Sequence, residues 1–190
     1  MHSFHPSILR EYDIRGVVGE TLSAADAYAI GRTFASFKPD WQGKSPKIAV
    51  GRDGRMSSPE LAKALIQGLN EAGADVVEIG VGPTPMLYFA VCAEKLDGGI
   101  MVTGSHNPPT HNGFKFMLGR KAFYGEDIKK LGVIAEKGEY FSGSGKVTQK
   151  NIEPEYVSVL LKAYESKRPL KVAWDAGNGA AGQVMKSLTE

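Results

Sequence analysis

The sequence contains a single cysteine, carries almost no net charge and has no long apolar run. Because Cys92 has no partner for an internal disulfide, it is typical of a protein in a reducing compartment, and we interpret it as a small buried side chain. Residues 1–6 lack the apolar segment of a signal peptide, and no stretch approaches a membrane span, so we predict a cytoplasmic protein without membrane contact. The formal net charge is +2 and the basic residues are scattered, so nucleic acid is not an expected partner.

Composition and the order of short apolar segments predict the fold class. Of the 190 residues, 42% are hydrophobic and 23% are charged, which suits a globular chain long enough for one domain and part of a second. Buried-strand patterns alternate with helical patterns: Lys47 to Val50 precedes a helix from Ser57 or Ser58, Asp75 to Gly80 precedes a helix from Thr84 to about Glu94, and a strand at Ile100 to Val102 comes next. Phe114 to Met117 and Lys121 to Tyr124 add a short hairpin. This order predicts a layered α/β/α domain with a mixed, largely parallel sheet.

The later part of the chain indicates a domain boundary. Gly138 to Gly145 is rich in glycine and serine, and we interpret it as the approach to that boundary. We expect residues 1–146 to form the first domain and residues 147–190 to begin a second, similar one. The second part would contain strands at Val147 to Ile152 and at Leu170 to Trp174.

One stretch joins a buried strand to a polar loop. Ile100 to Val102 is short and apolar, which places Ser105 just beyond the carboxyl end of a strand, where ligands bind in open α/β sheets. Gly104 would let the backbone approach a ligand closely. By residue type alone, the favoured interpretation of Ser105 is an N-cap or turn serine. Three neighbours favour phosphate chemistry at its hydroxyl instead: His106 and Asn107 in the same turn, and Lys115 after the next turn.

These residues also carry a family resemblance. The string Thr-Gly-Ser-His-Asn-Pro from Thr103, followed by Asn-Gly-Phe-Lys from Asn112, resembles the active-site serine loop of the α-D-phosphohexomutases, the family of phosphomannomutase and phosphoglucomutase. The string Tyr-Asp-Ile-Arg-Gly from Tyr12 is similar to the opening of these enzymes, where the arginine faces the catalytic serine and the tyrosine lines the same cleft. Without the resemblance, Arg15 would be interpreted as a surface cation paired with Asp13 or Glu11.

The resemblance extends through Gly-Arg-Asp-Gly-Arg, residues 51–55. We interpret Arg52, Asp53 and Arg55 as an ion-pair cluster that shapes its turn, and we prefer this interpretation to a direct catalytic role.

The resemblance implies a reaction and a set of site residues. Such an enzyme interconverts hexose 6-phosphate and hexose 1-phosphate, with mannose or glucose as the sugar, through a phosphoserine and a hexose 1,6-bisphosphate. The implied catalytic residues are Ser105, Lys115, Arg15 and His106, and the implied substrate-binding residues are Tyr12 and Asn107. Lys115 would stabilise the bridging or leaving oxygen and move a proton. Mg²⁺ would bind Ser105 through its phosphate.

Strings that complete the family's active site do not occur in this sequence. The metal loop Asp-Gly-Asp-Gly-Asp-Arg, a sugar loop of the Gly-Glu-Met-Ser type and the phosphate-binding loop of a fourth domain are missing. We therefore interpret the chain as an N-terminal fragment whose partners are a sugar phosphate and the C-terminal domains of its own parent chain. The fragment alone is expected to be inactive, because domain closure is needed to exclude water from the phosphoserine.

Other functions fit parts of the sequence. Residues 177–182 match the dinucleotide fingerprint G-x-G-x-x-G, but Glu190 ends the chain before the acidic residue that such a site needs about 20 positions further on. The same string resembles the first strand-to-helix turn of the second phosphohexomutase domain, where the glycines serve packing and turning. A serine-phosphate hydrolase would need an acidic metal cluster that the sequence does not offer. A phosphoglucosamine mutase stays possible, because the sugar is recognised by the third domain.

Overall fold

Parallel strands form one half of the sheet, as the order of strand and helix patterns predicted. The computed structural model describes residues 1–37, 41, 44–165 and 168–190. In it, β2 (Lys47–Arg52) pairs in parallel with β4 (Gly98–Val102) on one side and with β3 (Asp75–Val81) on the other, and β3 pairs in parallel with β7 (Val147–Gln149). The carboxyl ends of these strands therefore meet at one edge of the sheet, where ligands bind in such folds.

Antiparallel strands form the other half. The hairpin is confirmed, although its first strand is longer and its second shorter than predicted: β5 (His111–Leu118) pairs with β6 (Lys121–Ala122). The long β5 strand also lies between β4 and β1 (Ile14–Val17), antiparallel to both. The result is a seven-stranded mixed sheet in the order β1-β5-β4-β2-β3-β7, with β6 on β5.

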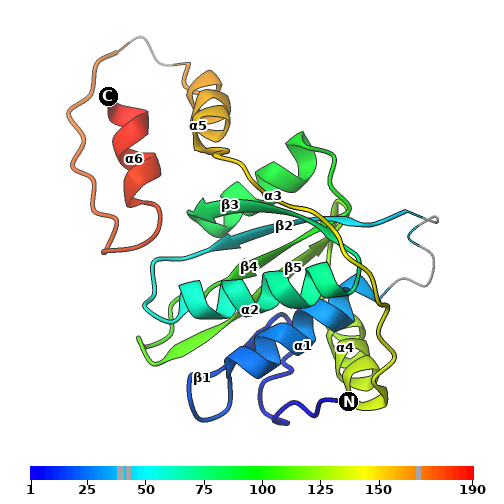
Figure 1. The fold of residues 1–190 in the computed structure, drawn as a ribbon. Helices are drawn as coiled ribbons and strands as arrows, with labels where there is room; N and C mark the ends of the chain where they lie inside the picture. Colours follow the sequence, from blue (N-terminus) through cyan, green and yellow to red (C-terminus); the bar gives the residue numbers. More distant parts are fainter. Residues whose placement is uncertain (38–40, 42–43, 166–167) are drawn as a thin grey trace.

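Helices cover both faces of the sheet, which confirms the layered α/β/α architecture (Figure 1). Alternate residues of β2 show the division, since Ile48 and Val50 belong to one apolar core and Ala49 to the other. The first core is closed by α1 (Ala24–Ala35), α2 (Ser58–Glu71) and α4 (Glu126–Lys137). The second is closed by α3 (Thr84–Ala93), with α5 (Glu153–Lys162) and α6 (Gly182–Thr189) beside it.

Helices α1 and α2 approach each other backbone to backbone. A Cβ atom added at Gly68 would lie 2.1 Å from the carbonyl oxygen of Tyr28, and one added at Gly31 would lie 2.3 Å from the carbonyl oxygen of Leu65. Both neighbours are main-chain atoms, so the helices would have to move apart to admit a side chain. These two glycines therefore set the spacing of the helix layer above β2 and β4.

We expect Gly68→Ala to lower the free energy of unfolding by about 2–3 kcal/mol, because the overpacked helices must separate. The measurement is urea denaturation followed by circular dichroism. Gly54→Ala is the matched control, since a Cβ there meets nothing within 4 Å and Gly54 does not have a positive φ. A midpoint for Gly68→Ala equal to that of the control would contradict this account of the helix contact.

The end of the described chain differs in part from the prediction. The strand expected at Val147 to Ile152 forms over its first three residues as β7, and it joins the same sheet as β2 and β3. The strand predicted at Leu170 to Trp174 is wrong: these residues have no strand pairing, and Leu170, Val172 and Trp174 are more than half exposed. An apolar alternation forms a strand only where a neighbouring strand satisfies its backbone groups. The boundary at residue 146 stays a prediction.

None of the helices in the described part of the chain has the length and apolarity needed to cross a bilayer.

Candidate active site

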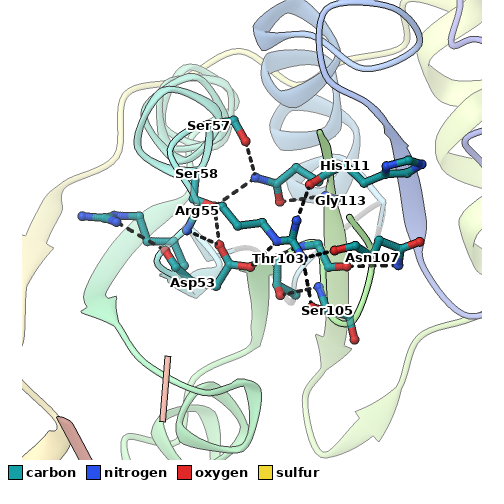
Figure 2. Close-up of polar contacts among 12 residues, drawn as sticks. Asp53, Arg55, Ser57, Ser58, Thr103, Ser105, Asn107, His111 and Gly113 are labelled. Carbon is teal, nitrogen blue, oxygen red and sulfur yellow. Dashed lines mark hydrogen bonds and ion pairs between the residues drawn. The ribbon is translucent and has the colours of Figure 1, made fainter. Parts of the chain in front are cut away.

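The serine loop, residues 103–110, leaves the carboxyl end of β4 and leads into β5 (Figure 2). Ser105 has a φ of +53°, a left-handed conformation that costs an L residue about 1–2 kcal/mol. Its amide donates to Thr103 Oγ1 over 2.9 Å, and Asn107 Nδ2 donates to the carbonyl of Gly104 over 3.1 Å. Local hydrogen bonds therefore close the loop into a tight turn with Ser105 beyond the strand end, as the strand pattern predicted.

His106 lies beside the serine hydroxyl. Its Nδ1 is 3.1 Å from Ser105 Oγ, a distance at which the imidazole and the hydroxyl form a hydrogen bond. Three of the predicted site residues, Ser105, His106 and Asn107, thus share one turn and contact each other or the same backbone. Their chemical roles stay predictions.

Two predicted cations meet on one buried carboxylate. Arg15 Nη2 donates to Asp13 Oδ2, and Lys115 Nζ lies 3.4 Å from the same oxygen. The Asp13 side chain is only 11% exposed, so it contributes a buried negative charge between the two positive ones. Arg15 Nε is also buried and has no hydrogen-bond partner within the described residues. The Asp13 partner was the sequence alternative for Arg15, and it proves compatible with Arg15 lying beside Lys115.

Sheet register places these two cations on one face of the sheet, near the edge at which β4 ends and the serine loop begins. Arg15 on β1 is the register partner of Gly113 on β5, and partners in register point to the same face. Lys115 lies two residues further along β5, so its side chain shares that face. Thr103 pairs with Gly113 from the other side, through its amide, over 2.9 Å. Gly113, which has no side chain, therefore lies between Arg15 on one side and Thr103 on the other. Thr103 is two residues before Ser105.

Tyr12 lies at the surface near these residues in sequence. It is 73% exposed, and its ring centroid is 6.3 Å from that of Tyr124. Over residues 1–37, 41, 44–165 and 168–190, no hydrogen bond or ion pair joins Ser105 to Tyr12, Arg15 or Lys115. The structure thus forms two groups, one on the serine loop and one around Asp13, on the same edge of the sheet.

A third group was only partly recognised in the sequence. The ion pair of Asp53 with Arg55 is confirmed at 3.2 Å, whereas Arg52 donates to the carbonyl of Asp53 at 3.4 Å. Asp53 Oδ2 also accepts the amide hydrogen of Gly104 over 3.1 Å. The loop after β2 therefore shapes the serine loop as well as its own turn. The available signal was position, since β2 and β4 are neighbours and both loops leave the same sheet edge.

No cluster of three or more His, Cys, Asp or Glu side chains suited to a metal ion occurs in the part of the chain that the structure describes. The residues present therefore do not fit a complete magnesium site, because Mg²⁺ prefers several oxygen ligands in near-octahedral geometry.

Comparisons with known proteins identify the family. A model of the phosphoglucomutase/phosphomannomutase α/β/α domain I matches residues 6–140. A phosphomannomutase/phosphoglucomutase of Pseudomonas aeruginosa is 46% identical over 184 residues, which cover 97% of this chain and 39% of that protein. A phosphoglucomutase of Neisseria meningitidis is 46% identical over 183 residues, which cover 95% of this chain and 39% of that protein.

A solved structure agrees with these relatives. The phosphoglucomutase/phosphomannomutase family protein of Burkholderia thailandensis superposes with a TM-score of 0.90 at 42% identity, over 97% of this chain and 42% of that one. The fold and the site define an α/β/α domain that presents a serine loop at the carboxyl edge of its sheet. The chain belongs to the phosphoglucomutase/phosphomannomutase family, and it spans about two fifths of the length of these relatives.

Proposed function

We propose that this chain supplies the phosphoserine domain of an enzyme that interconverts hexose 6-phosphate and hexose 1-phosphate, with mannose or glucose as the sugar. The observation that carries the proposal is the position of the Ser105 hydroxyl, beyond the end of β4 and on the sheet edge that also holds Arg15 and Lys115. Membership of the family, whose relatives are named as phosphomannomutase and phosphoglucomutase, supports the same reaction.

The proposed chemistry is two phosphoryl transfers. In the first, the bond between phosphorus and Ser105 Oγ breaks, a bond to a hydroxyl oxygen of the hexose phosphate forms, and that hydroxyl loses its proton. The product is a hexose 1,6-bisphosphate. This intermediate then reorients in the site, so that its other phosphate faces Ser105. In the second transfer the bond between that phosphorus and the sugar oxygen breaks, a bond to Ser105 Oγ forms, and the isomeric monophosphate is left. The protein mainly positions the reacting groups and offsets their negative charge.

Each remaining residue has a role that follows from its chemistry. Lys115 stabilises the bridging oxygen and moves a proton, and the Arg15 guanidinium offsets the negative charge of phosphate oxygens. His106 hydrogen-bonds to the serine hydroxyl, and Tyr12 and Asn107 line the substrate side. Mg²⁺ would bind Ser105 through its phosphate, with its other ligands supplied from outside the described residues.

The proposal also covers organisation and location. Residues 1–146 carry the serine loop, residues 147–190 begin a second domain, and the remaining partners are a sugar phosphate and the C-terminal domains of a longer parent chain. We include a cytoplasmic location, with neither nucleic acid nor membrane as partner, as the composition predicted.

Two alternatives are less well supported. The glycine string at 177–182 follows no strand, and Gly177 and Asn178 have φ values of +55° and +58°, which is the geometry of a turn. The amide of Gly177 bonds to its own neighbour, Asp175 Oδ1, over 2.8 Å. These contacts support turning rather than dinucleotide binding. A phosphoglucosamine mutase is disfavoured by the names of the relatives.

The test is phosphate transfer to the unphosphorylated full-length protein. We expect incubation with glucose 1,6-bisphosphate labelled in its phosphates to place label on Ser105, mapped by peptide mass spectrometry, and the protein to interconvert glucose 1-phosphate and glucose 6-phosphate. Purified residues 1–190 should show no interconversion, because the sugar-binding and metal loops are missing from them. Label confined to another residue, or mutase activity in residues 1–190, would refute the proposal.

A further inference from the structure

Arg55 binds the backbone of the serine loop through both terminal nitrogens of its guanidinium group (Figure 2). The side chain is 16% exposed and comes from the loop between β2 and α2. Nη1 and Nη2 each donate to two carbonyl oxygens, and Nε pairs with a carboxylate; the acceptors are Pro108 O at 2.7 Å, His111 O at 3.0 Å, Ser105 O at 3.0 Å, Asn107 O at 2.6 Å and Asp53 Oδ2 at 3.2 Å. The two Nη atoms carry four of the five N–H donors of an arginine, so all four are used by the loop carbonyls, and the ion pair holds the Nε side against Asp53.

Asp53 contacts both the Arg55 guanidinium and the start of α2. Its Oδ1 accepts from the Arg55 amide over 3.0 Å and from Ser58 Oγ over 2.5 Å. Asn112 Nδ2 at the start of β5 donates to both Ser57 Oγ and Ser58 Oγ over 2.9 Å. The polar network therefore connects the two ends of the serine loop to one helix, and two of its members, Ser58 and Asn112, are fully buried.

Gly104 makes room for this arrangement. A Cβ atom on Gly104 would lie 2.3 Å from both Cζ and Nε of Arg55 and 2.7 Å from the carbonyl oxygen of His111. The sequence suggested that this glycine admits a ligand, whereas its close neighbour in the structure is the guanidinium group. The missing side chain of Gly104 therefore allows the Arg55 guanidinium to lie against the serine loop.

The positions of the four carbonyl acceptors show which part of the serine loop Arg55 restrains. Two of the carbonyls belong to Ser105 and Asn107, on either side of His106, and two belong to the part of the loop that returns to β5. Hydrogen bonds from a charged donor are stronger than neutral ones, so they resist rotation of the backbone that carries Ser105 Oγ. A planar fork meets four carbonyls at fixed angles, and the single ammonium group of a lysine does not.

We propose that Arg55 is a positioning residue that holds the Ser105 hydroxyl in its reactive orientation without contacting phosphate. All four of its Nη–H groups donate to loop carbonyls, so a contact of either Nη with phosphate would cost a bond to the loop. The proposal rests on the proposed function for its kinetic consequence, while the control of loop order by Arg55 stands independently of it. It adds to the reaction a residue that sequence reasoning had placed only in its own turn.

The experiment compares Arg55→Lys with Arg52→Lys in the full-length protein. We expect Arg55→Lys to lower kcat about 10²-fold and to change KM for glucose 1-phosphate less than about 3-fold, because misplacement of a reacting group slows transfer while the substrate contacts remain. Hydrogen exchange of the Asn107 and His111 amides, which bond within the loop, should become faster. Arg52→Lys is the control, because the only hydrogen bond of the Arg52 side chain to the described residues goes to the Asp53 carbonyl, and all three quantities should stay unchanged.

Several results would overturn the proposal. An unchanged kcat for Arg55→Lys in an active protein would do so, and so would a raised KM with kcat intact, since that pattern belongs to a residue that binds substrate. If Arg55→Lys does not fold, Asp53→Asn keeps the arginine but removes the negative charge beside it and replaces one of two accepting oxygens by a donor, so the loop should still lose order. Wild-type kcat and wild-type exchange in that variant would also overturn the proposal. A wild-type protein without mutase activity would refute the proposed function instead, and the exchange measurement would still decide whether Arg55 holds the loop.

Discussion

Replacement of Ser105 by alanine is expected to reduce mutase activity of the full-length protein at least about 10³-fold, the scale seen when a group that carries a covalent intermediate is removed. Without Oγ there is no atom to carry the phosphoryl group between the two transfers, so neighbouring cations have nothing to stabilise. Transfer of labelled phosphate from glucose 1,6-bisphosphate should vanish as well. Coupled assay of glucose 6-phosphate formation and intact mass measure the two effects.

The matched control is Thr110→Ala, which removes a hydroxyl from the same loop. Thr110 Oγ1 lies 3.2 Å from His111 Nδ1 and bonds to no other described group, so we expect activity within about 3-fold of wild type. Folding is checked by the melting temperature, which Ser105→Ala should hardly change, because the one hydrogen bond of Ser105 Oγ within the described part of the chain is with the His106 ring. Retained mutase turnover in Ser105→Ala would remove the serine from the reaction.

The parallel half of the fold and the place of Ser105 were predictable because both depend on local patterns. Ile100 to Val102 form a buried strand in a chain where strands alternate with helices, and such strands end at a common edge. A serine three residues beyond that strand therefore lies at the edge whatever the details of pairing. The family resemblance rested on the same local strings, and the comparisons confirm it.

The antiparallel half depended on distant pairing, which short patterns do not encode. Nothing in residues 111–118 indicates that β5 separates β4 from β1, yet this order brings Arg15 and Lys115 to one face. The apolar alternation from Leu170 to Trp174 shows the opposite error, since a strand pattern without a neighbouring strand forms no strand. In both cases the outcome depended on which strand lies alongside, and not on the strand propensity of the segment itself.

The role of Arg55 was hidden for a different reason. Its acceptors are four backbone carbonyls. Every residue has a backbone carbonyl, so residue types do not indicate which carbonyls accept a hydrogen bond. The sequence showed the ion pair with Asp53 because both partners are charged side chains. Gly104 itself predicts a close approach, but the group that approaches it is a guanidinium from a loop about 50 residues earlier, which the local sequence does not indicate.

Lys115→Met is expected to lower kcat about 10²–10³-fold, the usual cost of removing one charged group that stabilises a developing negative charge. Methionine keeps the length and apolar stem of lysine, so packing on β5 is preserved while the ammonium group is lost. The side chain is 27% exposed and its pairing with Asp13 is 3.4 Å, which makes the ion pair worth at most about 1 kcal/mol of stability. Asp13 also keeps Arg15, so no buried carboxylate is left unpaired.

These numbers separate chemistry from folding in the Lys115→Met variant. The melting temperature should change by only a few degrees, while the rate of phosphate transfer from Ser105 to glucose 1-phosphate, measured in a single turnover, should show the whole loss. Lys121→Met provides the control, because Lys121 lies on β6 of the same hairpin, is exposed and forms no ion pair in the described structure. If both lysine variants transferred phosphate at the wild-type rate, the positive charge beside Asp13 would serve the sheet edge alone, and another group would have to offset the charge of the transferred phosphate.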